Sequence, residues 1–314
     1  MKLSHICKYI ISCKFFFVRF GLYKFLMLKA LPLIKFTFGC SKNRFSFYEF
    51  NALESYLGNL FKDKIAFYNN KYEEAEECNI PKVIWTCWWQ GEDNMPEIVK
   101  CCYKSLINNR GDNKVVLITK DNYTRYLNLP RQILELYKNR IIEFAFVSDV
   151  MRAGLLKQYG GLWIDITYLV TAPITINASR FYTIRAGKDD FLVPRGRWSG
   201  NCIGGFASYK LFAFLYDCLV DYWINNKYLV DYFLIDHIIN LAYDNFPDVK
   251  KDIDNIKFIF PNLINFNLNQ EYTSDTNIIL DVNQFIKLSW KKKYKYFLDD
   301  GRITNYNYIM NNYL

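Results

Sequence analysis

The chain has 314 residues, of which 51% are hydrophobic and 23% are charged. This composition allows one large α/β domain or two small domains, and it excludes a disordered chain because enough apolar surface is present to form a core. Only 14 glycines and 8 prolines occur, which excludes collagen-like and low-complexity proteins. The nine cysteines are odd in number and contain no Cys-x-x-Cys pair, so we expect reduced thiols and no zinc site.

The net charge of +9 comes from the first 45 residues. This basic arm, residues 1–45, holds nine lysines and arginines and no acid, whereas the remainder holds 31 basic and 31 acidic residues. A formally neutral body predicts no nucleic-acid partner, because nucleic-acid-binding domains usually carry a basic face. Two interpretations of the arm are open: it lies on an anionic membrane surface, with phenylalanines in the interface, or it packs on the body as helices.

Lysines interrupt the apolar stretches of the arm too often for a secretory signal peptide. No apolar stretch reaches the roughly 18 residues that span a bilayer. We therefore expect a cytoplasmic protein, held at the inner face of the plasma membrane where the arm binds lipid.

The body alternates segments with the periodicity of helices and segments with the composition of buried strands. The predicted helices cover residues 45–70, 96–108, 131–139, 147–159, 209–223 and 229–243. The predicted strands cover residues 82–89, 115–119 and 162–168, and an acidic run at 73–77 is expected to be a solvated connector. This order predicts an α/β fold with a mostly parallel sheet flanked by helices, in which ligands bind at the carboxyl ends of the strands. We divide the chain into the arm, a helical lead-in with its connector (46–79) and a sheet-containing domain (80–314).

One segment, residues 148–167, concentrates polar residues between apolar ones. Asp149 and Arg152 are three positions apart and share one face of the predicted helix. Trp163, Asp165 and Thr167 share one face of the predicted strand. A carboxylate two residues before a hydroxyl, at the end of a buried strand, can hold a hard cation or sugar hydroxyls.

Each of these residues also has a purely structural interpretation. Asp149 is favoured by the helix dipole in a first turn, and Arg152 can simply pair with it. Gly160-Gly161 can be only a helix end, and Asp165 can cap a turn. The occurrence of all these residues in one segment favours a ligand-binding site, because charged residues in an apolar helix must either form ion pairs or bind a ligand.

Two further segments carry candidate polar groups. Asp231, Asp236 and His237 lie in and before a predicted apolar helix, where an acid could deprotonate a hydroxyl or supply an oxygen to a metal. The alternative is that Asp231 is an N-cap and Asp236 is exposed. The loop from Trp198 to Gly205, with Asn201, is rich in glycine and could bring backbone close to a ligand.

The run S-D-x-x-R at 148–152, followed by Y-G-G-L-W-I-D-x-T at 159–167, resembles the nucleotide-sugar motif of the capsular polysaccharide synthesis proteins. These are glycosyltransferases related to the family 32 transferases that carry a D-x-D motif. Further matching blocks are I-P-K-V-I-W-T-C-W-W-Q-G at 80–91, L-V-D-Y-F-L-I-D-H at 229–237 and K-L-S-W-K at 287–291.

The resemblance implies a GT-A fold, a UDP-sugar donor, a divalent cation (Mn²⁺ or Mg²⁺) and a surface polysaccharide or lipid-linked glycan as acceptor. It implies that Trp85 and its neighbours hold the base, that Asp149 and Arg152 bind ribose and sugar, and that Asp165 is the metal ligand. The full set of implied donor-binding residues is Trp85, Asp149, Arg152, Gly160, Gly161, Trp163, Asp165, Thr167, Asn201, Lys287, Trp290 and Lys291. The implied catalytic residues are Asp165, Asp231, Asp236 and His237.

Thr167 departs from the family pattern, because it stands where D-x-D has its second Asp. A neutral hydroxyl is a poor ligand for Mg²⁺ or Mn²⁺. Either Asp165 holds the metal together with the diphosphate and one outside ligand, or lysines supply the charge instead. The candidate lysines are Lys287, Lys291, Lys292 and Lys293. Because of this departure, a second function stays open: the protein could be an inactive relative that binds a sugar nucleotide or acts as a scaffold in polysaccharide assembly.

Overall fold

The computed structural model describes residues 42–74, 79–176, 180–185, 193–226, 228–256 and 266–314. Nearly all of the basic arm therefore lies outside the described residues, and the structure does not distinguish between its two interpretations. None of the helices in the described part of the chain is long and apolar enough to cross a membrane. The cysteines described there are free: Cys87, Cys101, Cys102, Cys202 and Cys218.

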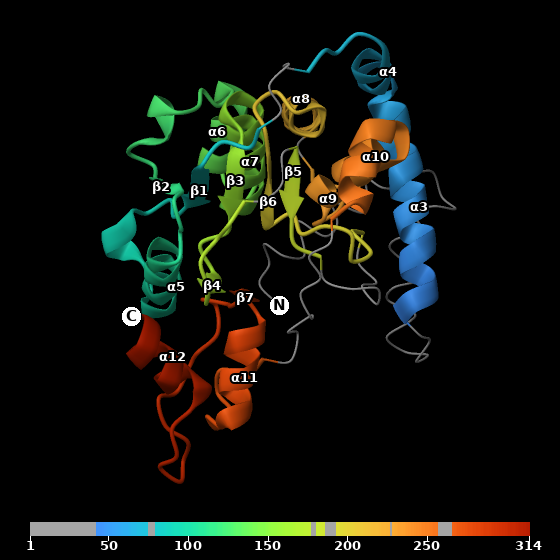
Figure 1. Cartoon of the computed structure of the whole chain (residues 1–314). Coiled ribbons are helices and arrows are strands. Elements are labelled where there is room, and N and C mark those ends of the chain that lie inside the picture. Colours follow the sequence, from blue (N-terminus) through green and yellow to red (C-terminus); the bar gives the residue numbers. More distant parts are fainter. Residues whose placement is uncertain (1–41, 75–78, 177–179, 186–192, 227, 257–265) are drawn as a thin grey trace.

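A five-stranded sheet forms the centre of the molecule (Figure 1). Its strands, in spatial order, are β2 (Lys114–Ile118), β1 (Val83–Cys87), β3 (Gly161–Ile164), β6 (Cys202–Gly205) and β5 (Phe181–Thr183). β1 pairs in parallel with both β2 and β3, whereas β6 pairs antiparallel with both β3 and β5. Four strands thus run in one direction and β6 runs against them, which confirms the predicted α/β fold with a mostly parallel sheet.

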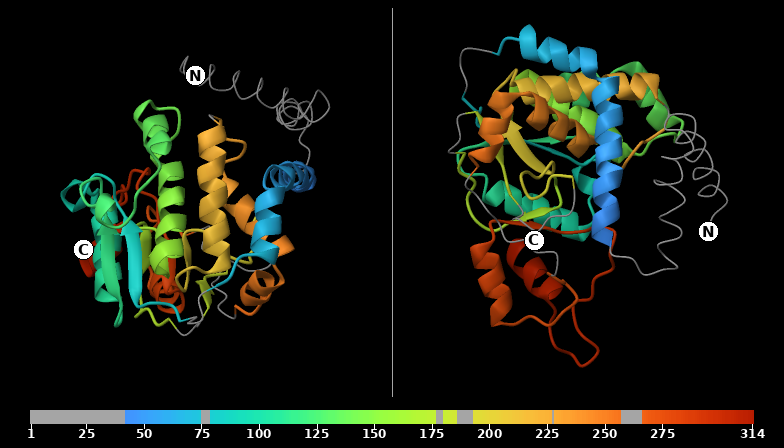
Figure 2. Two further views of the ribbon diagram at one scale, coloured as in Figure 1. Left: turned by 90° about the horizontal axis from the view of Figure 1, so that it is seen from above. Right: turned by 90° about the vertical axis from the view of Figure 1, so that its right-hand side faces the viewer.

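Helices cover both faces of this sheet (Figures 1 and 2). The helices of the described residues are α3 (Lys42–Leu60), α4 (Lys62–Asn70), α5 (Glu97–Asn108), α6 (Arg131–Lys138), α7 (Phe144–Tyr159), α8 (Lys210–Asn225), α9 (Leu234–Asn245), α10 (Pro247–Asp254), α11 (Ser274–Val282) and α12 (Asn305–Tyr313). Short 3₁₀ turns lie at Glu92–Asn94 and Tyr123–Arg125. A second, two-stranded sheet joins β4 (Tyr168–Val170) to β7 (Phe285–Lys287).

The sheet has two apolar faces because its side chains alternate. Trp85 and Trp163 point into the main core, which also contains α7 and α8 packed side by side. Ile84 and Leu162 point into the opposite core, against α5 and β4. The C-terminal segment adds a third cluster, in which α12 packs on α5.

The helical lead-in shares the main core. Leu53 and Leu57 on α3, Phe61 at the junction and Tyr68 on α4 are all buried there, and the two helices pack on α8 and α9. The hydroxyl of Tyr68 donates a hydrogen bond to Asp217 on α8 (2.6 Å). Residues 50–70 are therefore held to the domain by burial of apolar surface.

Four predicted elements differ from the structure. The strand predicted over 162–168 is two strands, because β3 pairs with β6 whereas β4 pairs with β7. The chain turns between β3 and β4, where the Tyr168 N–H donates a hydrogen bond to the Asp165 carbonyl (3.0 Å). The glycine-rich loop is largely strand β6, where Gly204 lets the backbone of Gly161 approach closely. The helix predicted from Leu229 begins at Leu234, and the helix predicted over 45–70 is broken at Phe61.

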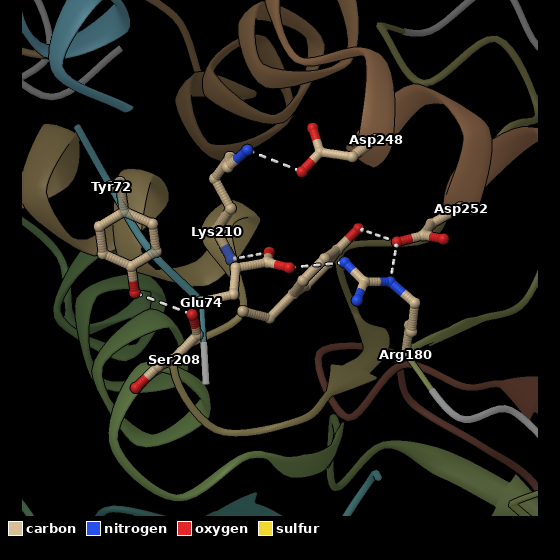
Figure 3. A network of polar contacts seen from close by, with 8 residues as sticks. Tyr72, Glu74, Arg180, Ser208, Lys210, Asp248 and Asp252 are labelled. Atoms are coloured by element: carbon tan, nitrogen blue, oxygen red, sulfur yellow. Dashed lines mark hydrogen bonds and ion pairs between the residues drawn. The ribbon is translucent and has the colours of Figure 1, made fainter. Parts of the chain in front are cut away.

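The acidic run is only partly a solvated connector. Glu74 accepts hydrogen bonds from Arg180 (2.6 Å) and from the backbone N–H of Lys210 (2.9 Å), and Arg180 also pairs with Asp252 on α10 (3.0 Å). Figure 3 shows Glu74, Arg180, Lys210 and Asp252 in this network. The hydroxyl of Tyr209 also donates a hydrogen bond to Asp252 (2.9 Å). The lead-in, the start of β5, α8 and α10 are thereby joined by charged hydrogen bonds.

We predict that Glu74→Ala lowers the free energy of unfolding by about 1–3 kcal/mol, because Arg180 and the Lys210 N–H lose a partly buried acceptor. Urea denaturation measures this change. Glu73→Ala is the matched control, since Glu73 is exposed and its replacement should change stability by less than about 0.5 kcal/mol. Equal effects of the two substitutions would contradict the structural assignment of Glu74.

Candidate functional site

A cleft of about 670 Å³ opens at the carboxyl ends of β1 and β3. Trp88 and Trp89, directly after β1, line it together with Asp165, directly after β3. The first half of α7, the chain before α9 and the turn after β7 form the remaining walls. The site therefore lies where ligands bind in sheets of this kind, as the sequence predicts.

Asp165 lines the cleft and is contacted by three side chains. Its Oδ1 accepts hydrogen bonds from the Trp163 indole (2.8 Å) and from Arg152 Nη2 (3.3 Å). Its Oδ2 forms an ion pair with Lys287 Nζ (2.7 Å). Arg152 Nη2 also lies 3.3 Å from Asp149 Oδ1. The carboxylates of Asp149 and Asp165 thus meet at one guanidinium.

Arg152 is fixed in place from several sides. It is 5% exposed, donates a hydrogen bond to the carbonyl of Gly200, and lies over the ring of Trp163, 5.1 Å from its centroid. Gly200 lies next to two charged side chains, since a Cβ there would be in ordinary van der Waals contact with Arg152 Nη1 (3.5 Å) and Asp236 Oδ1 (3.4 Å). The Nε–H of Arg152 is buried without a hydrogen-bond partner. A positive charge is thereby held rigidly at the floor of the cleft.

The two carboxylates beside Arg152 differ in their pKa values. Burial raises the pKa of Asp149 to about 7; Arg152 opposes the rise, while Asp165 and Asp236 add to it. Burial also acts to raise the pKa of Asp165, but Lys287 and Arg152 outweigh it and hold that pKa below its ordinary value. Asp165 is therefore ionised at neutral pH, whereas Asp149 titrates near neutrality.

We predict that the stability of Asp149→Asn relative to the wild type is higher at pH 8 than at pH 4. The pKa of Asp149 is higher in the native chain than in the unfolded chain. At pH values between these two pKa values the native state therefore binds more protons than the unfolded state, and the stability of the wild type falls as pH rises. The stability difference between variant and wild type should increase by on the order of 2 kcal/mol across this range.

Urea denaturation at each pH measures this difference. Asp121→Asn, at an exposed position, is the control and should show no comparable increase. A stability difference for Asp149→Asn that does not change with pH would contradict the assignment of a raised pKa to this carboxyl.

Most of the residues proposed from the sequence lie in the cleft. They are Asp149, Arg152, Trp163, Asp165, Thr167, Asn201, Asp236, Lys287, Trp290 and Lys291. Asp236 was also considered as an exposed side chain, but it is buried and accepts a hydrogen bond from the Trp198 indole (2.9 Å).

Trp85, Gly160 and Gly161 do not line the cleft, which corrects their expected placement. Trp85 is buried within β1 and donates a hydrogen bond to the Gly160 carbonyl (2.9 Å), whereas Trp88 and Trp89 reach the cleft. The two glycines have φ values of +64° and +92° and connect α7 to the start of β3. Their structural interpretation holds, because this tight connection requires backbone that favours glycine.

His237 and Asp231, two of the implied catalytic residues, also lie outside the cleft, which corrects their expected placement. His237 is fully buried, with its ring nitrogens 3.9 Å from Glu54 and 3.6 Å from Asp231 and no hydrogen bond on either nitrogen. Asp231 accepts a hydrogen bond from the Phe233 N–H (2.7 Å), but the N-cap of α9 is Phe233, so the N-cap alternative for Asp231 is wrong as well. The apolar packing of this helix draws His237 into the core.

The structure adds aromatic residues that the sequence did not single out. Tyr232 is 64% exposed at the cleft, with its ring 6.2 Å from that of Phe146. Trp88 meets Trp290 edge to face at 5.6 Å on another part of the wall. Aromatic residues make up 18% of the chain, so their presence alone could not identify these positions.

The residues around Asp165 do not fit a divalent cation. Both oxygens of Asp165 are engaged by cationic side chains, and the neighbouring cleft residue on the same turn is the neutral Thr167. Among the residues that the structure describes, no group of three or more His, Cys, Asp or Glu side chains could hold a metal ion. A divalent cation needs oxygen ligands that are free to face it.

The fold and the site define an α/β protein with a charged ligand cleft at the carboxyl ends of its strands. The chain matches the family described as "capsular polysaccharide synthesis protein" over residues 34–307, and it belongs to that family. A solved structure named "PaToxG Glycosyltransferase" is similar at 16% sequence identity and a TM-score of 0.41, covering 64% of this chain and 82% of that chain. No curated protein matches significantly.

Proposed function

We propose that this protein is a GT-A glycosyltransferase that moves a sugar from a nucleotide-sugar donor, most favourably a UDP-sugar, to a glycan acceptor. The acceptor we propose is a capsular or surface polysaccharide or its lipid-linked precursor. Membership of the capsular polysaccharide synthesis family supports this role. The observation that carries the proposal is the meeting of Asp149 and Asp165 at Arg152 within one cleft.

The cleft has the two kinds of group that a nucleotide sugar needs. Asp149 and Asp165 can accept hydrogen bonds from sugar and ribose hydroxyls. Arg152, Lys287 and Lys291 line the same cleft and can neutralise the negative charge of a diphosphate as it leaves. This juxtaposition favours a donor whose hydroxyls and phosphates lie side by side.

The aromatic walls can hold the flat parts of the two substrates. Trp88, Trp89 and Trp290 lie on the walls after β1 and β7, and we place the nucleobase against them because aromatic rings stack on bases. Tyr232 and Phe146 line the same cleft with their ring centroids 6.2 Å apart, and we place the acceptor against them. Asp236 is the only one of the three candidates before and in α9 that lines the cleft. We therefore assign to it, and not to Asp231 or His237, the expected contact with the acceptor.

A second candidate function is a sugar-nucleotide-binding or scaffold protein without turnover. Thr167 favours it, because it replaces a residue that the resemblance assigns to the metal. The two functions differ in one measurable property: a transferase hydrolyses its donor slowly when no acceptor is present, whereas a binding protein leaves it intact.

We predict that one of a panel of UDP-, GDP- and CMP-sugars raises the melting temperature, because ligands of the native state stabilise it. That donor should then be hydrolysed by the wild type. Asp165→Asn should lower the hydrolysis rate at least about 100-fold, since it removes the carboxylate that orders Arg152 and Lys287.

Asp231→Asn is the matched control, since Asp231 lies outside the cleft, and it should retain hydrolysis within about threefold. Stabilisation without hydrolysis by the wild type, with or without Mn²⁺, would favour the binding function. Full activity of Asp165→Asn would remove this residue from the site.

We further propose that the basic arm holds the protein on an anionic membrane, where a lipid-linked acceptor is found. Its nine cations and its phenylalanines support this proposal. Deleting residues 1–38 should abolish co-sedimentation with vesicles of phosphatidylglycerol and leave a folded protein. Aggregation of the truncated chain, with no vesicle binding by the full chain, would show that the arm packs on the body instead.

A further inference from the structure

We propose that the ammonium of Lys287, and not a divalent cation, joins Asp165 to the diphosphate of the donor. Nucleotide binding by this protein then needs no metal. The inference rests on the proposed function and specifies how its donor phosphates are held.

The position of Lys287 is built into the fold. Lys287 is the last residue of β7 and is paired with Tyr168 of β4, while the N–H of Leu288 donates to the Thr167 carbonyl (2.9 Å). The ammonium lies 2.7 Å from Asp165 Oδ2 and 4.8 Å from the ring centroid of Tyr168. The two-stranded sheet thus brings a cation directly to the carboxylate of the motif.

Lys287 has capacity left for a ligand. Its side chain is 38% exposed, and it lines the cleft. An ammonium has three N–H donors, and the contact with Asp165 uses one of them. The other donors are available to phosphate oxygens entering the cleft. Lys291, on the turn that follows, supplies a second ammonium to the same wall.

The local charge favours an anion over a metal ion. Asp165 is flanked by Arg152 and Lys287, and burial raises the pKa of Asp149, so that this second carboxyl is partly neutral near pH 7. A divalent cation at Asp165 Oδ2 would have to displace the ammonium or lie beside it, and like charges at such distances repel strongly. A diphosphate gains from the same charges.

The test measures the affinity of the protein for UDP by calorimetry, once with EDTA and once with Mn²⁺. GDP and CDP are further probes. We expect the wild type to bind with the same affinity, within about twofold, in both conditions. Lys287→Gln should weaken binding at least about tenfold in both, since a charged hydrogen bond is lost. Lys287→Arg should retain most of the affinity because it keeps the charge.

Lys292→Gln is the matched control, since Lys292 is exposed and does not line the cleft; its affinity for UDP should be unchanged. The double variant Thr167→Asp with Lys287→Gln exchanges the built-in cation for a carboxylate. It should gain Mn²⁺ binding that the wild type lacks and should bind UDP more tightly with Mn²⁺ than with EDTA.

The possible outcomes separate the lysine bridge from the proposed function. A wild type that binds UDP only with Mn²⁺, or a folded Lys287→Gln variant with wild-type affinity, overturns the lysine bridge and leaves the proposed function standing. A wild type that binds none of the three nucleotides under either condition overturns the proposed function, and the inference with it. A melting curve for each variant separates loss of binding from loss of fold.

Discussion

The site depends on one buried guanidinium. Arg152 is 5% exposed and contacts Asp149, Asp165 and the carbonyl of Gly200, which come from α7, the end of β3 and the turn before β6. A buried cation is costly unless it is paired, so these elements must be brought together for the chain to fold. The same contacts bring two carboxylates together in the cleft, and the site is therefore set by a single constraint.

The strand ends then decide which groups face the ligand. β3 ends at Ile164 because its pairing with β6 stops there, and the chain turns at Asp165 before β4 pairs with β7. This turn points the Asp165 carboxylate into the cleft and brings Lys287 to it from a segment 122 residues away. Carboxylates for hydroxyls and cations for phosphates consequently meet at one edge of the sheet.

The sequence predicted what depends on local periodicity. The mostly parallel sheet and the helix carrying Asp149 and Arg152 followed from spacing and from the order of the elements. That Asp165 shares a site with these two residues was implied by the family resemblance, and the structure brings the three together. Long-range packing decided the rest. Neither the burial of His237 nor the choice of Trp88 over Trp85 at the cleft could be predicted, because both depend on which elements pack on either side of a strand or helix. The glycines of β6 suggested a loop in the sequence. In the structure they are needed because β3 and β6 approach too closely for a side chain at Gly204.

The most direct test is a crystal structure of the protein with UDP bound in the presence of EDTA. The account predicts that the diphosphate lies in the cleft, with its oxygens within hydrogen-bond distance of the Lys287 ammonium. It also predicts the ribose beside the Asp149–Arg152–Asp165 cluster. A nucleotide bound elsewhere, with this cluster covered or unchanged, would contradict the account.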